Sequence, residues 1–78
     1  MASSQSQCSA RLIRAVALDH DGRLPDALYH YEAGLELLLA EVSAEADPGR
    51  KARLREKAHE ILTRAETIKR RLASRSGF

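Results

Sequence analysis

Apolar residues recur at helical spacing in three segments of this chain, and turn-forming residues separate the segments. Gly22 and Pro25 interrupt the first pair of segments, and Asp47-Pro48-Gly49 interrupts the second pair. Proline fits the first turn of a helix, so both prolines indicate helix starts, and Asp47 is placed to cap the third helix. The pattern predicts helices over about residues 7–20, 25–43 and 50–74, with residues 1–6 disordered and residues 75–78 frayed.

The first and third segments each have a narrow apolar face. The first segment is expected to bury the face that consists of Leu12, Ile13, Val16 and His20. The smaller residues Ala15 and Cys8 lie at the edge of this face. The third segment repeats apolar residues at alternating spacings of four and three, which indicates a single heptad-like seam. The seam consists of Leu54, Ala58, Ile61, Ala65, Ile68 and Leu72.

The second segment has a much broader apolar face, which spans roughly 140° of a helical wheel. That face consists of Ala27, Leu28, Tyr31, Gly34, Leu35, Leu38, Leu39 and Val42. A helix with so broad a face must contact two neighbours, and short connections favour antiparallel neighbours. The fold class predicted is therefore all-α, an antiparallel three-helix bundle over residues 7–74 with the second helix in the middle. Gly34 costs about 1 kcal/mol in a helix, and a close approach of a neighbouring helix would explain it.

Composition agrees with a small helical domain that folds without covalent crosslinks. The 78 residues are enough for one domain, and only 4% are aromatic while 31% are charged. Cys8 is the single cysteine, so no internal disulfide is possible and a reducing compartment is expected. No apolar run approaches the roughly 20 residues of a membrane span, and the N-terminus lacks the apolar core of a signal peptide. A cytoplasmic protein is expected.

Charge is distributed unevenly along the chain. Residues 1–49 carry three basic and eight acidic side chains, whereas residues 50–78 carry ten basic and three acidic ones. Oppositely charged helices that attract each other across solvated edges explain this asymmetry, and so does a basic surface for an acidic partner. The cluster Lys69-Arg70-Arg71 with Arg75 also suits the C-terminal end of a helix dipole.

No constellation of catalytic or metal-binding residues is recognisable. The chain lacks phosphate-binding glycine loops, nucleophile elbows and zinc-binding motifs. His20, His30 and His59 fall on three different segments, and His20 between two aspartates at a helix end is more typical of a solvated or capping residue. We expect no enzyme activity, no cofactor and no metal site.

Two leucines depart from the seams. Leu62 lies about 80° around the wheel from the centre of the third seam, and Leu37 lies at the edge of the second helix's apolar face. Each is compatible with an ordinary half-buried flank or with the lining of a surface groove. Glu66 and Lys69 share the side of Leu62, and an apolar floor with a carboxylate at its rim suits an amphipathic helix that carries Leu and Arg.

Residues 15–19, 22–28 and 31–39 resemble helices 1 and 2 of MIT (microtubule-interacting and trafficking) domains. Residues 54–57 and 62–69 resemble the family's third helix, with its Arg-Ala-Glu triplet before a Lys. The resemblance covers about residues 8–73. It implies a three-helix adaptor, a monomer fused to an effector, that binds C-terminal tails of ESCRT-III (CHMP-type) subunits at endosomal or midbody membranes and meets the membrane only indirectly.

The resemblance also implies where the partner docks. One class of tail motif binds as a helix between helices 2 and 3, and another binds in extended form between helices 1 and 3. In the first groove, Leu62 is the key leucine and Glu66 accepts a basic side chain. The remaining partner-binding residues that we expect there are Ala58 and Ala65 on the floor, Leu38 on the other wall, and Lys69 and Leu37 nearby.

Two alternatives use the same residues differently. A basic bundle could bind acidic lipid or nucleic acid through residues 50–75, although no aromatic residue is interleaved for stacking on bases. A tetratricopeptide-like helix pair would need stacked neighbours for stability. If the chain is a three-helix adaptor of the MIT type, no binding to nucleic acid is expected.

Overall fold

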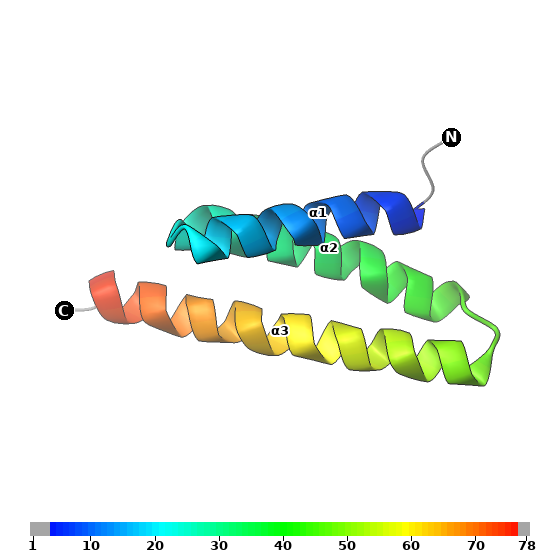
Figure 1. Cartoon of the computed structure of the whole chain (residues 1–78). Coiled ribbons are helices and arrows are strands. Elements are labelled where there is room, and N and C mark those ends of the chain that lie inside the picture. Colours follow the sequence, from blue (N-terminus) through cyan, green and yellow to red (C-terminus); the bar gives the residue numbers. More distant parts are fainter. Residues whose placement is uncertain (1–3, 77–78) are drawn as a thin grey trace.

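The computed structural model describes residues 4–76 of the chain, which form three helices joined by short turns. The helices are α1 (Ser4–His20), α2 (Leu24–Ala44) and α3 (Pro48–Ser76). Successive helices run in opposite directions, and α2 lies between α1 and α3 (Figure 1). The predicted all-α antiparallel three-helix bundle is confirmed.

The helices extend further than the sequence pattern predicted. Residues 4–6 belong to α1 although residues 1–6 were expected to be disordered, and Arg75 and Ser76 belong to α3 although residues 75–78 were expected to fray. Residues 1–3 and 77–78 lie outside the described residues. At both ends of the described chain, the helix continues through polar residues beyond the apolar residues that pack in the core.

The turn between α1 and α2 is closed by a glycine in the left-handed region. Gly22 has φ of +77°, and its N–H donates to the carbonyl oxygen of Asp19 at 3.0 Å. The N–H of Arg23 donates to the carbonyl oxygen of Leu18 at 2.9 Å. These two bonds form a Schellman motif, in which glycine is favoured because it has no Cβ.

The start of α3 follows the predicted capping. The carboxylate of Asp47 accepts a hydrogen bond from the backbone N–H of Arg50 at 2.8 Å, and Pro48 is the first residue of the helix. One exposed N–H of the first turn is thereby satisfied, and Pro48 has no N–H of its own that would need a partner.

The core is the surface that α2 shares with its two neighbours. The third-helix seam is confirmed, because Ala58, Ile61, Ala65 and Ile68 are buried against α2 while Leu54 and Leu72 are partly buried. From α2 the buried side chains include Ala27, Tyr31 and Leu38. A central helix with a broad apolar face therefore provides half of each of the two helix–helix interfaces.

The predicted buried face of α1 was wrong. Ile13 is 70% exposed and Val16 is 46% exposed, whereas Cys8, Ala15 and Leu18 are buried. The two faces share Leu12, which is half-buried. Small side chains at positions 8 and 15 let α1 approach α2 closely, so the buried face follows the small residues instead of the large aliphatic ones.

Gly34 makes this close approach possible, as its position in the sequence suggested. A Cβ atom at residue 34 would lie 2.6 Å from Cδ2 and 2.9 Å from Cγ of Leu12. The thiol of Cys8 donates to the carbonyl oxygen of Gly34 at 3.4 Å. Burial, reinforced by the charge of Glu41, raises the pKa of Cys8, so the thiol stays protonated and acts as a packing residue.

The clash with Leu12 predicts that the effect of Gly34→Ala on the free energy of unfolding changes sign when Leu12 is replaced by alanine. Gly34→Ala should lower the free energy of unfolding by about 1–3 kcal/mol, because the new methyl group overpacks the α1–α2 interface. In a Leu12→Ala background the same substitution should raise it by about 1 kcal/mol, since alanine is the better helix former. Urea unfolding followed by circular dichroism measures all four proteins. An equal effect of Gly34→Ala in both backgrounds would contradict the packing described.

Candidate functional site

A polar cluster links α1 to α3 across the open side of the bundle. The guanidinium of Arg64 donates to both carboxylate oxygens of Asp19, with Nε–Oδ2 at 2.7 Å and Nη2–Oδ1 at 2.6 Å. The hydroxyl of Tyr31 donates to the same carboxylate at 2.9 Å. This bidentate pair with a third donor is the strongest polar interaction between α1 and α3 in the described part of the chain.

The cluster shifts the ionisation of its members. The hydrogen bonds from Arg64 lower the pKa of Asp19 although burial opposes them, and the Tyr31 hydroxyl lowers it further. Burial and the neighbouring Asp19 raise the pKa of Tyr31, which therefore stays protonated as a donor. Both oxygens of the Asp19 carboxylate accept hydrogen bonds from protein donors, so this side chain links α1 to α2 and α3.

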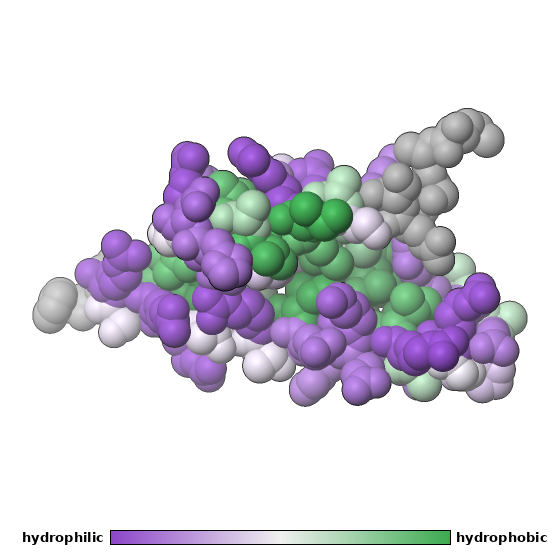
Figure 2. All heavy atoms as spheres, viewed as in Figure 1, coloured by the Kyte–Doolittle hydropathy of each residue, from purple (hydrophilic) through white to green (hydrophobic). Residues whose placement is uncertain are grey.

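A shallow groove runs between α1 and α3 because the two helices do not pack directly. Within the described residues, no Cα atom of α1 comes within 8 Å of one of α3. A pocket of about 190 Å³ lies in this groove, and its lining includes Leu12, Val16, Lys57 and Glu60. Figure 2 shows apolar surface on α1 and between α1 and α3, bordered by hydrophilic side chains of α3. This groove mixes apolar and charged groups.

A second groove runs between α2 and α3, and its lining is more apolar. A pocket of about 290 Å³ lies between Leu35 and Leu39 of α2 and Ala58 and Leu62 of α3. Leu39 is 50% exposed and Leu62 is 42% exposed. Leucines on the two walls with an alanine between them leave an apolar trough of the kind that accepts one face of a helix.

The rim of the α2–α3 groove carries charges that differ along its length. Arg55 and His59 line the pocket on the N-terminal side of Leu62 in α3. Beyond Leu62, Glu66 is exposed, and the ammonium of Lys69 lies 3.0 Å from the carboxylate of Glu32 in α2. The groove is therefore basic at the end near Arg55. At the other end, beyond the leucines, lie the acidic side chain of Glu66 and the Lys69–Glu32 ion pair.

The structure brings some of the predicted partner-binding residues together at this groove. Leu62 and Ala58 line it, and Ala65 is buried next to them in the α3 seam. Glu66 follows one turn after Leu62 on the exposed side of α3. Lys69 of α3 forms an ion pair with Glu32 of α2, so its ammonium already has an acidic neighbour in the domain without a partner.

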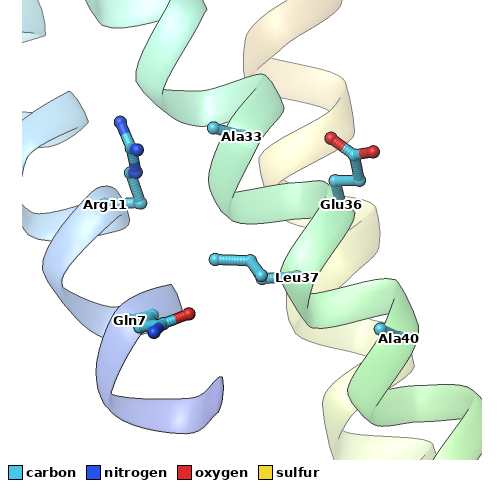
Figure 3. A pocket seen from close by; sticks show the side chains of 6 residues that line it. All are labelled: Gln7, Arg11, Ala33, Glu36, Leu37 and Ala40. Carbon is cyan, nitrogen blue, oxygen red and sulfur yellow. The ribbon is translucent and has the colours of Figure 1, made fainter. Parts of the chain in front are cut away.

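Two predicted residues lie elsewhere. Leu38 is 3% exposed and belongs to the core, so Leu35 and Leu39 form the α2 wall in its place. Leu37 does not reach the α2–α3 groove. It points into the space between α1 and α2 (Figure 3). Both corrections have one cause: a helical wheel locates the apolar face of α2 but does not say which flank of it each neighbour covers.

Sequence reasoning also missed residues that matter here. Leu35 and Leu39 were included in the broad face of α2 but treated as core, although their position at its edge was the available signal. The pairing of Asp19 with Arg64 joins residues 45 positions apart, and no local pattern reveals such a contact. Within the described residues, no group of His, Cys, Asp and Glu side chains could hold a metal ion.

None of the helices, over their described residues, is long and apolar enough to cross a membrane. Among known protein families, the model described as the MIT (microtubule interacting and transport) domain matches residues 10–70, well over half of the 78-residue chain. The matched region starts in α1 and ends in α3, and it includes both grooves.

The Asp19 carboxylate predicts a specific dependence of stability on pH. Asp19→Asn should lower the free energy of unfolding by about 1–3 kcal/mol at neutral pH, because Arg64 loses its charged partner. The folded pKa of Asp19 is lowered, so its contribution is fully present above the unfolded pKa of about 4 and is lost as pH falls through the folded pKa. The difference between wild type and variant should thus be constant above about pH 5 and shrink below about pH 4.

Urea unfolding at a series of pH values measures this difference. Asp21→Asn, an exposed neighbour in the same turn, is the matched control and should change stability little at any pH. A difference for Asp19→Asn that persists undiminished into acid would show that the ion pair is not its source.

Proposed function

The chain belongs to the MIT domain family, whose members are generally non-catalytic interaction modules, and we propose that it binds a helical C-terminal motif of an ESCRT-III subunit in the α2–α3 groove. We further infer from the sequence resemblance to the N-terminal domain of MIT domain-containing protein 1 that the chain serves as an adaptor. Through that contact the domain would recruit a fused effector to endosomal or midbody membranes.

The observation that carries the proposal is the unfilled apolar trough between Leu39 and Leu62. Both side chains are about half exposed although apolar surface is buried elsewhere along the same two helices. An amphipathic helix that places leucines between these walls would remove that surface from water and would lie alongside α2 and α3 as a fourth helix. Ala58 on the floor leaves room for the partner's side chains.

Charges on the rim of the α2–α3 groove favour a partner helix that lies in one direction along the groove. An acidic side chain of the partner would meet Arg55, and a basic side chain would meet Glu66 at the other end. Such exposed pairs contribute little free energy but fix orientation and register. A short helix with a few leucine anchors and one or two ion pairs should bind with a Kd on the order of micromolar.

The basic surface of α3 supports a competing function, binding of acidic lipid or nucleic acid. Arg70, Arg71 and Arg75 are exposed near the C-terminal end of α3. Binding through these residues would fall steeply with added salt and would not depend on Leu62. The two functions therefore separate in a single salt titration.

A pair of matched variants tests which groove is used. Leu62→Asp should weaken binding of ESCRT-III tail peptides at least about tenfold, because it places a charge in the apolar trough. Val16→Asp, at a similarly exposed residue of the α1–α3 groove, should leave that binding unchanged. Fluorescence polarisation with labelled peptides measures both.

Circular dichroism of both variants controls for folding, since each substitution replaces a half-exposed side chain. If Val16→Asp abolishes binding and Leu62→Asp does not, the partner occupies the α1–α3 groove and the assignment is wrong. Loss of helical signal in Leu62→Asp would place Leu62 in the core.

Reversal of one charge tests the proposed polarity. Glu66→Lys should weaken binding of a motif with a basic residue at its matching position by about two- to fivefold. A peptide in which that basic residue is replaced by Glu should recover the loss with the variant but not with the wild-type domain. Equal affinities in all four combinations would remove Glu66 from the site.

A further inference from the structure

The C-terminal end of α3 carries a serine among basic residues that the proposed function does not use. Ser74 is exposed, and Lys69, Arg70 and Arg71 lie five, four and three residues before it. Protein kinases select their substrates partly by charge, and one large class selects arginine at the third position before the residue that it modifies. An exposed hydroxyl with arginine at this spacing is the pattern of a phosphorylation site.

The pattern occurs twice in the chain, and the structure distinguishes the two occurrences. Thr67 follows Arg64 at the same spacing. The Arg64 guanidinium is held by the Asp19 carboxylate, so a kinase could bind it only after that ion pair breaks. The Thr67 hydroxyl donates to the carbonyl oxygen of Thr63 at 3.0 Å, well before α3 ends at Ser76. Thr67 is therefore protected by the folded bundle.

The end of α3 that carries Ser74 is much less constrained. In the described part of the chain, Leu72 is the last residue of α3 that packs against the core, and it is only partly buried. Ala73, Ser74 and Arg75 are exposed, and this end of α3 extends beyond the turn that joins α1 to α2 (Figure 1). A helix end with few tertiary contacts opens at little cost, so the last turn can enter a kinase cleft while the bundle stays folded.

Two arginines are placed to hold a phosphate on Ser74. Residues three and four apart are neighbours on a helix surface, so Arg70 and Arg71 flank Ser74 one turn earlier. Neither arginine takes part in an ion pair of the described residues, and Arg70 donates to the Thr67 hydroxyl through a long hydrogen bond of 3.4 Å. Charge-assisted bonds from both guanidiniums would offset the unfavourable position of a phosphate at the negative end of the helix dipole.

We propose that Ser74 is a phosphorylation site for a kinase that selects arginine at the third position before the serine, and that Arg70 and Arg71 hold the phosphate. In the reaction the Ser74 hydroxyl oxygen bonds to the γ-phosphorus of ATP, and the bond from that phosphorus to the β–γ bridging oxygen breaks. ADP leaves, and a base of the kinase takes the hydroxyl proton.

The modification would remove most of the positive charge at this end of α3. A phosphate carries about −1.5 to −2 charges at neutral pH, which balances the two arginines that hold it. An acidic partner that binds Arg70 and Arg71 would then be released, as polybasic surfaces are released from acidic membranes by phosphorylation. Ser74 does not line the α2–α3 groove, so the site is independent of the proposed peptide binding.

Mass spectrometry of the 78-residue chain tests the site, after incubation with ATP and a purified calmodulin-dependent protein kinase, which selects arginine at this position. Phosphate should appear on Ser74 and not on Thr67, and Ser74→Ala should abolish its incorporation. Arg71→Ala should slow the reaction at least about tenfold, because the kinase loses the side chain that it selects. Arg53→Ala removes an equal, exposed charge near the other end of α3 and should leave the rate unchanged. Phosphate on Thr67, no incorporation, or equal rates for Arg71→Ala and wild type would overturn the proposal.

Phosphorus NMR of the modified chain tests how the phosphate is held. Its second pKa should lie below the ordinary value of about 6, since two guanidiniums favour the doubly charged form. Arg70→Ala should raise that pKa back toward about 6, whereas Arg53→Ala should not change it. Circular dichroism confirms that each variant is folded. An ordinary phosphate pKa in the wild-type chain would show that Arg70 and Arg71 do not hold the group.

Discussion

Helix α2 packs against α1 and α3 at the same time, while the backbones of α1 and α3 stay apart. This arrangement needs a helix that is apolar over much of its circumference, and it leaves grooves where α2 meets each neighbour and between α1 and α3, whose backbones stay apart. Among the described residues these grooves differ in chemistry: the lining is apolar between α2 and α3, mixed between α1 and α3, and charged on both walls between α1 and α2. The same constraint thus shapes both the core of the domain and the grooves on its surface.

Because the backbones of α1 and α3 stay apart, the polar contacts between these two helices are made by long side chains. Arg64 reaches from α3 to Asp19 of α1, and Tyr31 of α2 donates to the same carboxylate. This three-residue cluster connects all three helices through one anion. It also keeps Arg64 from being available as a partner-binding cation, although Arg64 belongs to the triplet by which the family resemblance was recognised.

The parts of the fold that were predictable are those that depend on local chemistry. The cap at Asp47, the single seam of α3 and the close approach at Gly34 each follow from a residue type whose physical reason lies within a few positions. The buried face of α1 was not predictable, because two overlapping faces both contain apolar residues and only the shape of α2 decides between them. For the same reason Leu37 and Leu38 were misplaced, whereas Leu62, at the edge of a narrow seam, was located in its groove.

Chemical-shift mapping of the amide and methyl groups of the domain during titration with an ESCRT-III tail peptide tests the central claim most directly, since it reports every residue at once. Docking in the α2–α3 groove predicts that the largest perturbations fall on Leu35, Leu39, Ala58 and Leu62, with small changes along the α1–α3 groove. Perturbations that centre on Leu12, Val16 and Lys57 would contradict it and would place the partner between α1 and α3.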